Sequence, residues 1–378
     1  MTETTSRIKV LHIIDKFTVD GLNPTSCTRL FAAWVPHFDS KEFEMVFCGI
    51  KTPEPAGQWL RDFGNTVIYL NKGKFSPSTV SAIEQVIRSE GVSIVHLHGY
   101  SSANFGRLAA ARCGIPAVVH EHAILTIRPH QYCADFLLRN KTTAGVAVSQ
   151  AVKRFMIHGR SIPEQTIRVI HNGVIFDDFH ASSPDQVAAL RAELCIPDGF
   201  SVVGTVTRLR EEKGNRYFID AAARVVHRFP KTKFVLIGEG PLRGELESQA
   251  ARLGIRDSVL FTGFRQDIPV CMSMFTVLVM PSLTEGFPLV LVEAMAVGKA
   301  VVATRVGGIS EIVQDGVDAL LVPPTDFNAL AEKIELLLTE PQTARRIAQT
   351  AIESCRRFSL DSNVRQLQDL YRQLVKRP

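Results

Sequence analysis

Short apolar runs alternate with longer stretches of helical period along the first half of the chain. Runs such as residues 8–14 (IKVLHII) are rich in β-branched residues, and an amphipathic stretch follows each of them. This alternation is typical of parallel βα units in a doubly wound sheet. The predicted strands are residues 8–14, 44–48, 66–70, 94–98, 117–120 and 145–148. The predicted helices are residues 25–34, 57–63, 78–89 and 103–113.

The alternation starts again after Asn172-Gly173, which predicts a second domain of the same class. Residues 177–186 are polar without a period and are predicted to be a linker, and residues 361–375 form an amphipathic helix. The predicted strands of this half are residues 201–206, 233–237, 258–261, 277–280 and 300–303. The predicted helices are residues 216–227, 244–253, 290–296 and 329–338.

The length of 378 residues is too great for one ordinary core. We therefore predict an α/β protein with two Rossmann-like domains, over residues 1–176 and 187–360. In such sheets ligands bind at the carboxyl ends of the strands.

The charge distribution restricts the partners. Residues 1–180 hold 19 Lys and Arg against 15 Asp and Glu, so most of the net charge of +5 lies in the first half. This excess is compatible with an anionic acceptor or a peripheral contact with a membrane surface, but no run of Lys and Arg is dense enough for a polybasic patch, so an ordinary solvated surface is favoured. No recognition motif for nucleic acid is present, so a nucleic-acid partner is not predicted.

Cysteine usage and hydropathy indicate the compartment. The seven cysteines are scattered without a CxxC pair, which is typical of free thiols in a reducing cytosol. No signal peptide is evident at the start, and no run of 18 apolar residues occurs. We expect a cytoplasmic protein whose membrane contact, if any, is peripheral.

A first candidate site follows the strand at residues 201–206, in the sequence GTVTRLREEKG. Arg208 and Lys213 lie in a strand-to-helix loop closed by Gly214, and Asn215 could cap the next helix. Two cations facing a helix N-terminus suit a diphosphate. The alternative is a pair of solvated loop charges.

Two further turns follow neighbouring strands. Gly238 and Gly240 permit a tight turn and close approach to a ligand, although a ligand-free turn is equally compatible. Because Gly244 falls one position late and Pro241 intervenes, a nicotinamide cofactor is not favoured. Arg265 could contact a nucleoside base through its backbone, or it could be an exposed loop residue.

The most informative segment is residues 281–298, which contains two glutamates eight residues apart. Glu285 follows a buried strand, and Glu293 lies in an otherwise apolar helix. Burying a carboxylate among apolar residues is costly without a partner, and sugar or ribose hydroxyls are suitable partners. The alternative is that Glu285 caps the helix and Glu293 reaches an arginine.

These motifs, together with residues 301–313 (VVATRVGGISEIV), resemble glycosyltransferase family 4, the retaining enzymes of the GT-B fold. The resemblance extends to residues 169–174 (VIHNGV) and to the last helix. It implies an N-terminal acceptor domain and a C-terminal donor domain that face a central cleft, with helix 361–378 crossing back onto the first.

The resemblance also implies roles for individual residues. Arg208 and Lys213 would hold the diphosphate, and Glu293 would bind the ribose hydroxyls. Glu285 would hold the donor sugar together with the backbone of Gly286–Leu289. No metal ion is required by such enzymes. The donor-binding residues are predicted to be Gly21, Gly238, Gly240, Arg265, Gly286, Phe287, Pro288, Leu289 and Glu293.

The N-terminal candidate is His122 in the sequence VVHEHA. In the family a histidine at this strand end approaches the reacting sugar, and His122 is preferred over His120 because it lies beyond the strand. Their spacing would also suit a metal, but no third ligand is evident. A structural histidine is the alternative for His122. His96 and His98 are expected to pack against the next loop, and Glu121 is a weak candidate nucleophile.

The first βα loop departs from the family pattern. The family usually carries a Gly-Gly pair there, whereas this chain has DGLNPTS over residues 20–26. Gly21 remains, Leu22 replaces the second glycine and Pro24 removes a backbone donor. Thr25 and Ser26 still permit an anion site at the helix start. The departure makes the acceptor side unusual and leaves activity itself open.

The predicted reaction transfers a hexose from a nucleoside diphosphate sugar to a hydroxyl group with retention. A UDP-sugar is favoured, and a GDP- or ADP-sugar is possible. The acceptor would be a glycan, a lipid-linked sugar or a small molecule in cell-surface polysaccharide synthesis. Two alternatives are an inactive nucleotide-sugar-binding scaffold and a sugar-nucleotide epimerase. A phosphorylase would need a pyridoxal phosphate lysine, for which no segment is visible.

Overall fold

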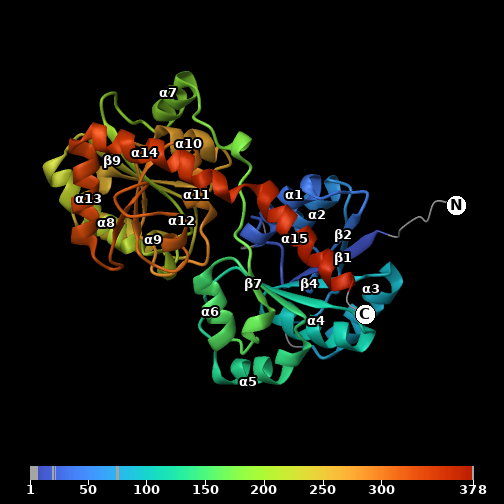
Figure 1. Cartoon of the computed structure of the whole chain (residues 1–378). Helices are drawn as coiled ribbons and strands as arrows, with labels where there is room; N and C mark the ends of the chain where they lie inside the picture. The colour runs from blue at the N-terminus through green and yellow to red at the C-terminus, as the bar shows by residue number, and fades with distance from the viewer. Residues whose placement is uncertain (1–6, 19–20, 22, 74–75, 377–378) are drawn as a thin grey trace. The chain divides into compact units, whose positions relative to one another are not determined.

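The computed structural model describes residues 7–18, 21, 23–73 and 76–376. The chain divides into two compact units, and helices surround a parallel sheet in each of them (Figure 1). Unit 1 comprises residues 1–173 and 360–378, and unit 2 comprises residues 174–359. The predicted α/β class with two Rossmann-like sheets is confirmed.

Unit 1 contains a sheet of seven strands within the described residues, in the order β3-β2-β1-β4-β5-β6-β7, and all its pairings are parallel. Strands β1, β2, β4 and β5 are buried almost along their full length, as expected for a sheet covered on both faces. The strands are β1 (Ile8–Ile14), β2 (Phe43–Gly49), β3 (Thr66–Tyr69), β4 (Ile94–His98), β5 (Ala117–Glu121), β6 (Ala144–Ala147) and β7 (Ile167–Val169).

The helices of unit 1 begin and end at recognisable signals. Ser149 caps α6 by accepting a hydrogen bond from the Val152 backbone amide at 3.1 Å, and Gly91 ends α3 in the left-handed conformation. The helices are α1 (Ser26–Trp34), α2 (Pro55–Asp62), α3 (Ser78–Glu90), α4 (Tyr100–Cys113), α5 (Pro129–Leu138), α6 (Gln150–His158) and α15 (Leu360–Val375).

The C-terminal helix α15 belongs to unit 1 although it follows unit 2 in the sequence (Figure 1). Its apolar side is buried, and Asn363 accepts a hydrogen bond from the Trp34 indole at 2.7 Å. Arg372 forms two hydrogen bonds to the carboxylate of Glu42, at 2.8 and 2.6 Å. The helix therefore packs against α1 and β4 of unit 1.

Unit 2 contains a parallel sheet of six strands within its described residues, in the order β10-β9-β8-β11-β12-β13. Phe218 and Phe234 stack edge to face in its core, at a centroid distance of 5.3 Å. The strands are β8 (Ser201–Val206), β9 (Thr232–Ile237), β10 (Val259–Gly263), β11 (Val277–Met280), β12 (Ala300–Thr304) and β13 (Leu320–Val322). The helices are α7 (Pro184–Glu193), α8 (Asn215–Arg228), α9 (Arg243–Arg252), α10 (Ile268–Met274), α11 (Leu289–Ala296), α12 (Ile309–Ile312), α13 (Phe327–Thr339) and α14 (Pro341–Cys355).

Several elements were not predicted. Helices α5, α6, α7, α10, α12 and α14 and strands β7 and β13 are additions. Helix α7 starts at Pro184, inside the segment expected to be a linker, because Ser183 and Gln186 form a reciprocal capping box there. The boundary between the two units falls between Gly173 and Val174.

Each sheet has one point at which the strand order reverses. In unit 1 this point lies between β1 and β4, and in unit 2 it lies between β8 and β11. Ligands of doubly wound sheets bind outside the carboxyl ends of the strands at this position. The loops after β8 and β11 are therefore where a ligand of unit 2 is expected.

Candidate active site

The strand-order reversal of unit 2 brings Lys213 and Glu285 together. The Lys213 ammonium lies 2.6 Å from a carboxylate oxygen of Glu285, and the Ser282 hydroxyl donates to the same oxygen at 2.7 Å. Glu285 is buried and Lys213 is mostly buried. The two residues are 72 positions apart in the chain, so the fold, not sequence proximity, creates this pair.

Glycines allow the loops around this pair to press against one another. Gly214 has a φ of 63°, and a Cβ there would lie 2.0 Å from the Pro281 carbonyl oxygen. Gly307 has a φ of 49°, and its Cβ would lie 1.9 Å from the Glu285 carbonyl oxygen. The loops after β8, β11 and β12 thus pack backbone to backbone.

The predicted pair Gly238 and Gly240 closes the same end of the sheet. A Cβ on Gly238 would lie 2.0 Å from the Thr207 carbonyl oxygen, and one on Gly240 would lie 2.3 Å from that of Leu209. The Leu209 amide donates to the Glu239 carbonyl at 3.0 Å. These glycines bring the loop after β9 against the loop that carries Arg208.

Arg208 has a half-exposed side chain 3.8 Å from Glu212. Its carbonyl oxygen accepts a hydrogen bond from the Asn215 side-chain amide at 3.0 Å. Asn215 is the first residue of α8 and does not cap it, so the predicted cap was wrong. The left-handed Gly214 occupies the N-cap position instead.

Gly286, Phe287 and Pro288 are buried in the loop that leads into α11, and Leu289 begins that helix. Glu293 lies partly buried in the helix interior. The structure thus brings Glu285 and the residues after it to the strand-order reversal, in the loop directly before the helix that carries Glu293.

Arg265 does not lie as an exposed loop residue. Its guanidinium donates to Glu193 at 2.6 Å and to Asp267 at 2.8 Å, and these hydrogen bonds raise its pKa. The side chain is therefore engaged within unit 2. Gly263 lies two residues before Arg265, and its carbonyl accepts from the Gly238 amide at 2.8 Å.

In unit 1 the first loop is only partly described. Asp20 and Leu22 lie outside the described residues. Gly21 has a φ of 93°, and none of the other described residues has an atom within 4 Å of the position of its Cβ. Thr25 caps α1 by accepting a hydrogen bond from the Thr28 amide at 3.1 Å. This amide is therefore not available to bind an anion at the start of the helix.

The strand-order reversal of unit 1 carries an acidic group. A carboxylate oxygen of Asp15 accepts from the Ser102 amide at 2.7 Å, at the start of α4, and the other accepts from the Ser101 amide at 3.2 Å. The partial positive charge at the start of α4 stabilises the negative charge of the Asp15 carboxylate. A small pocket of about 160 Å³ at this place is lined by Asp15, Lys16, Ile50, Lys51 and Ser101.

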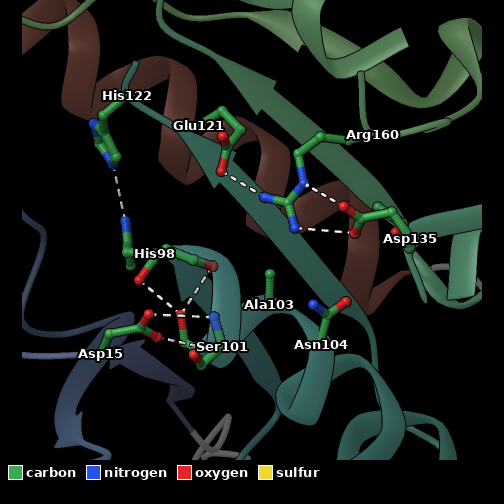
Figure 2. A network of polar contacts seen from close by, with 12 residues as sticks. Asp15, His98, Ser101, Ala103, Asn104, Glu121, His122, Asp135 and Arg160 are labelled. Atoms are coloured by element: carbon green, nitrogen blue, oxygen red, sulfur yellow. Dashed lines mark hydrogen bonds and ion pairs between the residues drawn. The ribbon is translucent and has the colours of Figure 1, made fainter. Parts of the chain in front are cut away.

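His122 and Glu121 face opposite sides of β5, as Figure 2 shows. His122 is partly buried and lies toward His98, with Nε2 3.0 Å from Nδ1 of His98. Burial lowers the pKa of His122 to about 4, so its imidazole is neutral at neutral pH.

Glu121 belongs to a buried ionic cluster on the other face. Its carboxylate accepts from Arg160 at 2.6 Å, and Arg160 also binds Asp135 at 3.0 and 3.1 Å (Figure 2). Arg107 donates to the same Asp135 at 2.5 Å. Burial raises the pKa of Glu121, although Arg160 opposes that shift. A carboxylate enclosed in this way is not a nucleophile for substrate.

His96 and His98 were expected to pack against the next loop, which was wrong. They are fully buried on one face of β4, where His12 of β1 and His120 of β5 join them. The sequence showed no third ligand beside His120 and His122, but the structure supplies His98. One nitrogen of each of these three residues lies within 4.8 Å of the others.

The sequence and structure of the chain match those of known sugar-transferring enzymes. Residues 186–354 match the model for glycosyl transferases group 1, and residues 34–178 match the model for glycosyltransferase family 4. The chain belongs to glycosyltransferase family 4. The resemblance identified from Arg208, Lys213 and the two glutamates is thereby confirmed, and the protein is an enzyme of the glycosyltransferase class.

Curated relatives of this family 4 enzyme act on different sugars. It is 29% identical to alpha-D-kanosaminyltransferase of Streptomyces kanamyceticus, over 76% of this chain and 79% of the relative. It is 24% identical to the UDP-Gal:alpha-D-GlcNAc-diphosphoundecaprenol alpha-1,3-galactosyltransferase of Escherichia coli, over 78% and 79% of the two chains.

Solved structures confirm the GT-B fold. Anabaena HepE in complex with UDP and glucose is 25% identical, with a TM-score of 0.85 over 97% of this chain and all of HepE. A glycosyltransferase from Rickettsia africae ESF-5 has a TM-score of 0.87 at 20% identity, over 98% of this chain and all of the other. Among the described residues of this enzyme, no helix is long and apolar enough to span a bilayer.

Proposed function

We propose that this glycosyltransferase moves a hexose, with retention, from a nucleoside diphosphate sugar to a hydroxyl group. The observation that carries the proposal is the Lys213–Glu285 pair at the strand-order reversal of unit 2. A cation and a carboxylate held together there offer partners for a phosphate and for sugar hydroxyls. The HepE complexes with UDP, with UDP and glucose, and with UDP-glucose support a UDP-sugar as the donor.

Unit 2 is the donor domain in this proposal. Arg208 and Lys213 bind the diphosphate and stabilise the negative charge that develops as it leaves. Glu293 binds the ribose hydroxyls, and Glu285 holds the donor sugar together with the backbone of Gly286–Leu289. Gly238, Gly240 and the backbone at Arg265 line the nucleotide. Arg208 and Lys213 neutralise the diphosphate charge in place of a divalent ion, so the reaction needs no metal.

Unit 1 is the acceptor domain, and His122 and Gly21 are its donor-side contacts. The acceptor hydroxyl attacks on the face from which the diphosphate departs, and the leaving phosphate oxygen takes the hydroxyl proton. No protein nucleophile takes part, which agrees with the enclosure of Glu121 by Arg160. Orientation and charge stabilisation then supply most of the rate enhancement.

The acceptor is proposed to be a glycan or a lipid-linked sugar in cell-surface polysaccharide synthesis. The Escherichia coli relative is named for a diphosphoundecaprenol-linked acceptor. The basic excess of residues 1–180 supports a peripheral contact with the anionic cytoplasmic face of a membrane.

The first test is the release of nucleoside diphosphate from a panel of UDP-, GDP- and ADP-sugars. Wild type is compared with Lys213→Ala and Glu293→Ala. We expect release from one donor to fall by roughly 10²-fold or more in both variants, because charge stabilisation and ribose binding are lost. Arg224→Ala is the control, because Arg224 pairs with Glu332 and Glu335 and donates to Asn328, none of which belongs to the proposed site.

Two results would contradict the proposal. One is an equal loss of release in Arg224→Ala and in the two site variants. The other is an inverted anomeric centre in the isolated product, read from its NMR coupling constants, which would exclude retention while leaving the donor site intact.

A further inference from the structure

Six aromatic side chains of unit 1 form two hydrogen-bonded rows that lie across its strands. The first row is His12, His98 and His122: His12 Nδ1 lies 3.2 Å from His98 Nε2, and His98 Nδ1 lies 3.0 Å from His122 Nε2. The second row is Tyr371, His96 and His120: the Tyr371 hydroxyl lies 2.5 Å from His96 Nδ1, and His96 Nε2 lies 3.1 Å from His120 Nδ1.

The rows stack on one another under α1 and α15. The ring centroids of His96 and His98 are 4.4 Å apart, and those of His120 and His122 are 4.1 Å apart, with ring planes within 25°. Trp34 of α1 stacks over the second row, 6.1 Å from His120. Each row runs obliquely across the strands. Every hydrogen bond between two histidines joins residues that are two positions out of strand register: His12 is opposite His96 but bonds to His98.

The histidines of the rows are neutral. Burial lowers the pKa of His12 to about 3 and that of His122 to about 4, and it holds those of His96, His98 and His120 well below their usual value. A neutral imidazole has one donor and one acceptor nitrogen. Because each hydrogen bond needs one donor and one acceptor, fixing the tautomer of one histidine fixes the tautomers of the other histidines in that row.

The buried end of the first row sets its direction. His12 Nε2 has no hydrogen-bond partner among the residues that the structure describes. An orphaned buried N–H is rarer than an under-satisfied acceptor, so this atom carries the lone pair and His12 Nδ1 carries the hydrogen. His12 then donates to His98 Nε2, and His98 Nδ1 donates to His122 Nε2.

We propose that the first row holds His122 as the Nδ1–H tautomer, so that it meets a ligand as a neutral hydrogen-bond donor. His98 is then a positioning residue that acts through His122. His12 determines which nitrogen of His98 carries the hydrogen. Figure 2 shows His98 and His122 facing each other. The catalytic consequence rests on the proposed function, in which His122 contacts the reacting sugar; the tautomer itself does not.

A metal ion is the competing use of these nitrogens. His98, His120 and His122 each place a nitrogen within 4.8 Å of the others. A metal needs three lone pairs that converge at about 2.0–2.1 Å. Here the facing nitrogens of His98 and His122 are already at hydrogen-bond distance, and the rings of His120 and His122 are stacked. The hydrogen-bonded row accounts for both observations.

The direct test is long-range ¹H–¹⁵N NMR of the full chain labelled with ¹⁵N-histidine, with the His122 signals assigned by their loss in His122→Ala. We expect Nε2 of His122 in the unprotonated range and Nδ1 in the protonated range at neutral pH. Protonated Nε2 with bare Nδ1, or an average of both tautomers, would overturn the proposal. The tautomer is read from wild type, and His122→Gln provides the assignment where His122→Ala fails to fold.

A matched pair of variants tests the positioning role. His98→Phe removes the donor to His122 and keeps an aromatic ring, and His96→Phe makes the same change two residues away in the second row. We expect kcat to fall about fivefold in His98→Phe, the rate equivalent of one hydrogen bond, with an unchanged donor KM. His98→Asn, whose amide can replace Nδ1–H, should restore the tautomer. An equal loss in His96→Phe would indicate a merely structural effect.

Two further measurements separate the possible failures. Unchanged turnover in His122→Ala would remove His122 from the proposed reaction, while the NMR result would still decide its tautomer. Stoichiometric Co²⁺ binding to wild type, with ligand-field bands lost in His98→Phe, would overturn the proposal in favour of a metal site.

Discussion

Each of the five histidines under α1 and α15 is neutral in the folded protein, because burial disfavours its charged form. The unfolded chain, with an ordinary histidine pKa near 6.5, binds protons that the folded chain does not. Unit 1 therefore carries an acid sensitivity in its core that is independent of its carboxylates.

We expect the free energy of unfolding of unit 1 to fall as pH falls below about 6.5. The folded pKa values are depressed, so each buried imidazole costs roughly 1.4 kcal/mol per pH unit between about 6 and 4. Urea unfolding followed by tryptophan fluorescence measures this, because Trp34 and Trp59, the only tryptophans, both lie in unit 1.

His12→Phe is the control for this pH dependence, since it removes one buried imidazole and keeps an aromatic ring. Its slope against pH should be shallower than that of wild type by about one fifth. An unfolding free energy that stays flat from pH 7 to 5.5 would show that the imidazoles are charged in the folded protein.

The sequence indicates some of these residues better than others. Lys213 and Glu285 follow strands whose pattern is clear, so their meeting at the end of one sheet follows from the topology. The histidine rows depend on a bond between residues two positions out of register, and on Tyr371 from the far end of the chain. The sequence singled out His96 and His98 as well as His120 and His122, but it gave no sign of the contacts between the two pairs.

At the scale of elements, three loops of unit 2 meet with almost no side chain between them. The Leu283 amide donates to the Glu212 carbonyl at 2.9 Å, and the Gly308 amide donates to that of Glu285 at 3.1 Å. Short strands and their turns were predictable, whereas β13, with three residues, and α12, with four, are too short to show a period.

Gly214→Ala should displace the loop after β11 and reduce donor turnover strongly. Its Cβ would lie 2.0 Å from a backbone oxygen, which cannot move without moving Pro281. Gly316→Ala is the matched control, because Gly316 has a similar positive φ of 75° and a Cβ there would have no atom within 4 Å in the part of the chain that the structure describes. In both variants the left-handed backbone lowers the free energy of unfolding by about 1 kcal/mol.

Thermal unfolding and nucleoside diphosphate release of the two glycine variants are compared. Gly316→Ala should lose only stability, and Gly214→Ala should lose stability and release together. Equal release in both variants would mean that the approach of these two loops does not shape the site.

At the scale of the whole molecule, unit 1 is discontinuous in sequence. The chain leaves it at Gly173 and returns at Leu360 with α15. That helix brings Asn363 to Trp34, Tyr371 to His96 and Arg372 to Glu42. The amphipathic pattern of residues 361–375 predicted the helix, but only the resemblance to the family predicted where it packs.

Leu367→Asp should release α15 and destabilise unit 1 by several kcal/mol, because Leu367 is fully buried and an unpaired carboxylate cannot replace it. Arg365→Asp introduces the same residue on the exposed side of the same helix and should have little effect. Tryptophan fluorescence again reports unit 1. Similar unfolding midpoints for the two variants would show that α15 adds little to the stability of unit 1.

The return of the chain to unit 1 also sets an order of assembly on the ribosome. Residues 174–359 form a continuous unit and can fold as soon as they emerge, whereas residues 1–173 must wait for α15, which emerges only after residues 174–359. At ordinary synthesis rates this delay is on the order of 10–40 s. During that time the nascent first unit lacks the helix that covers its histidine rows, so the second unit can complete its fold before the first.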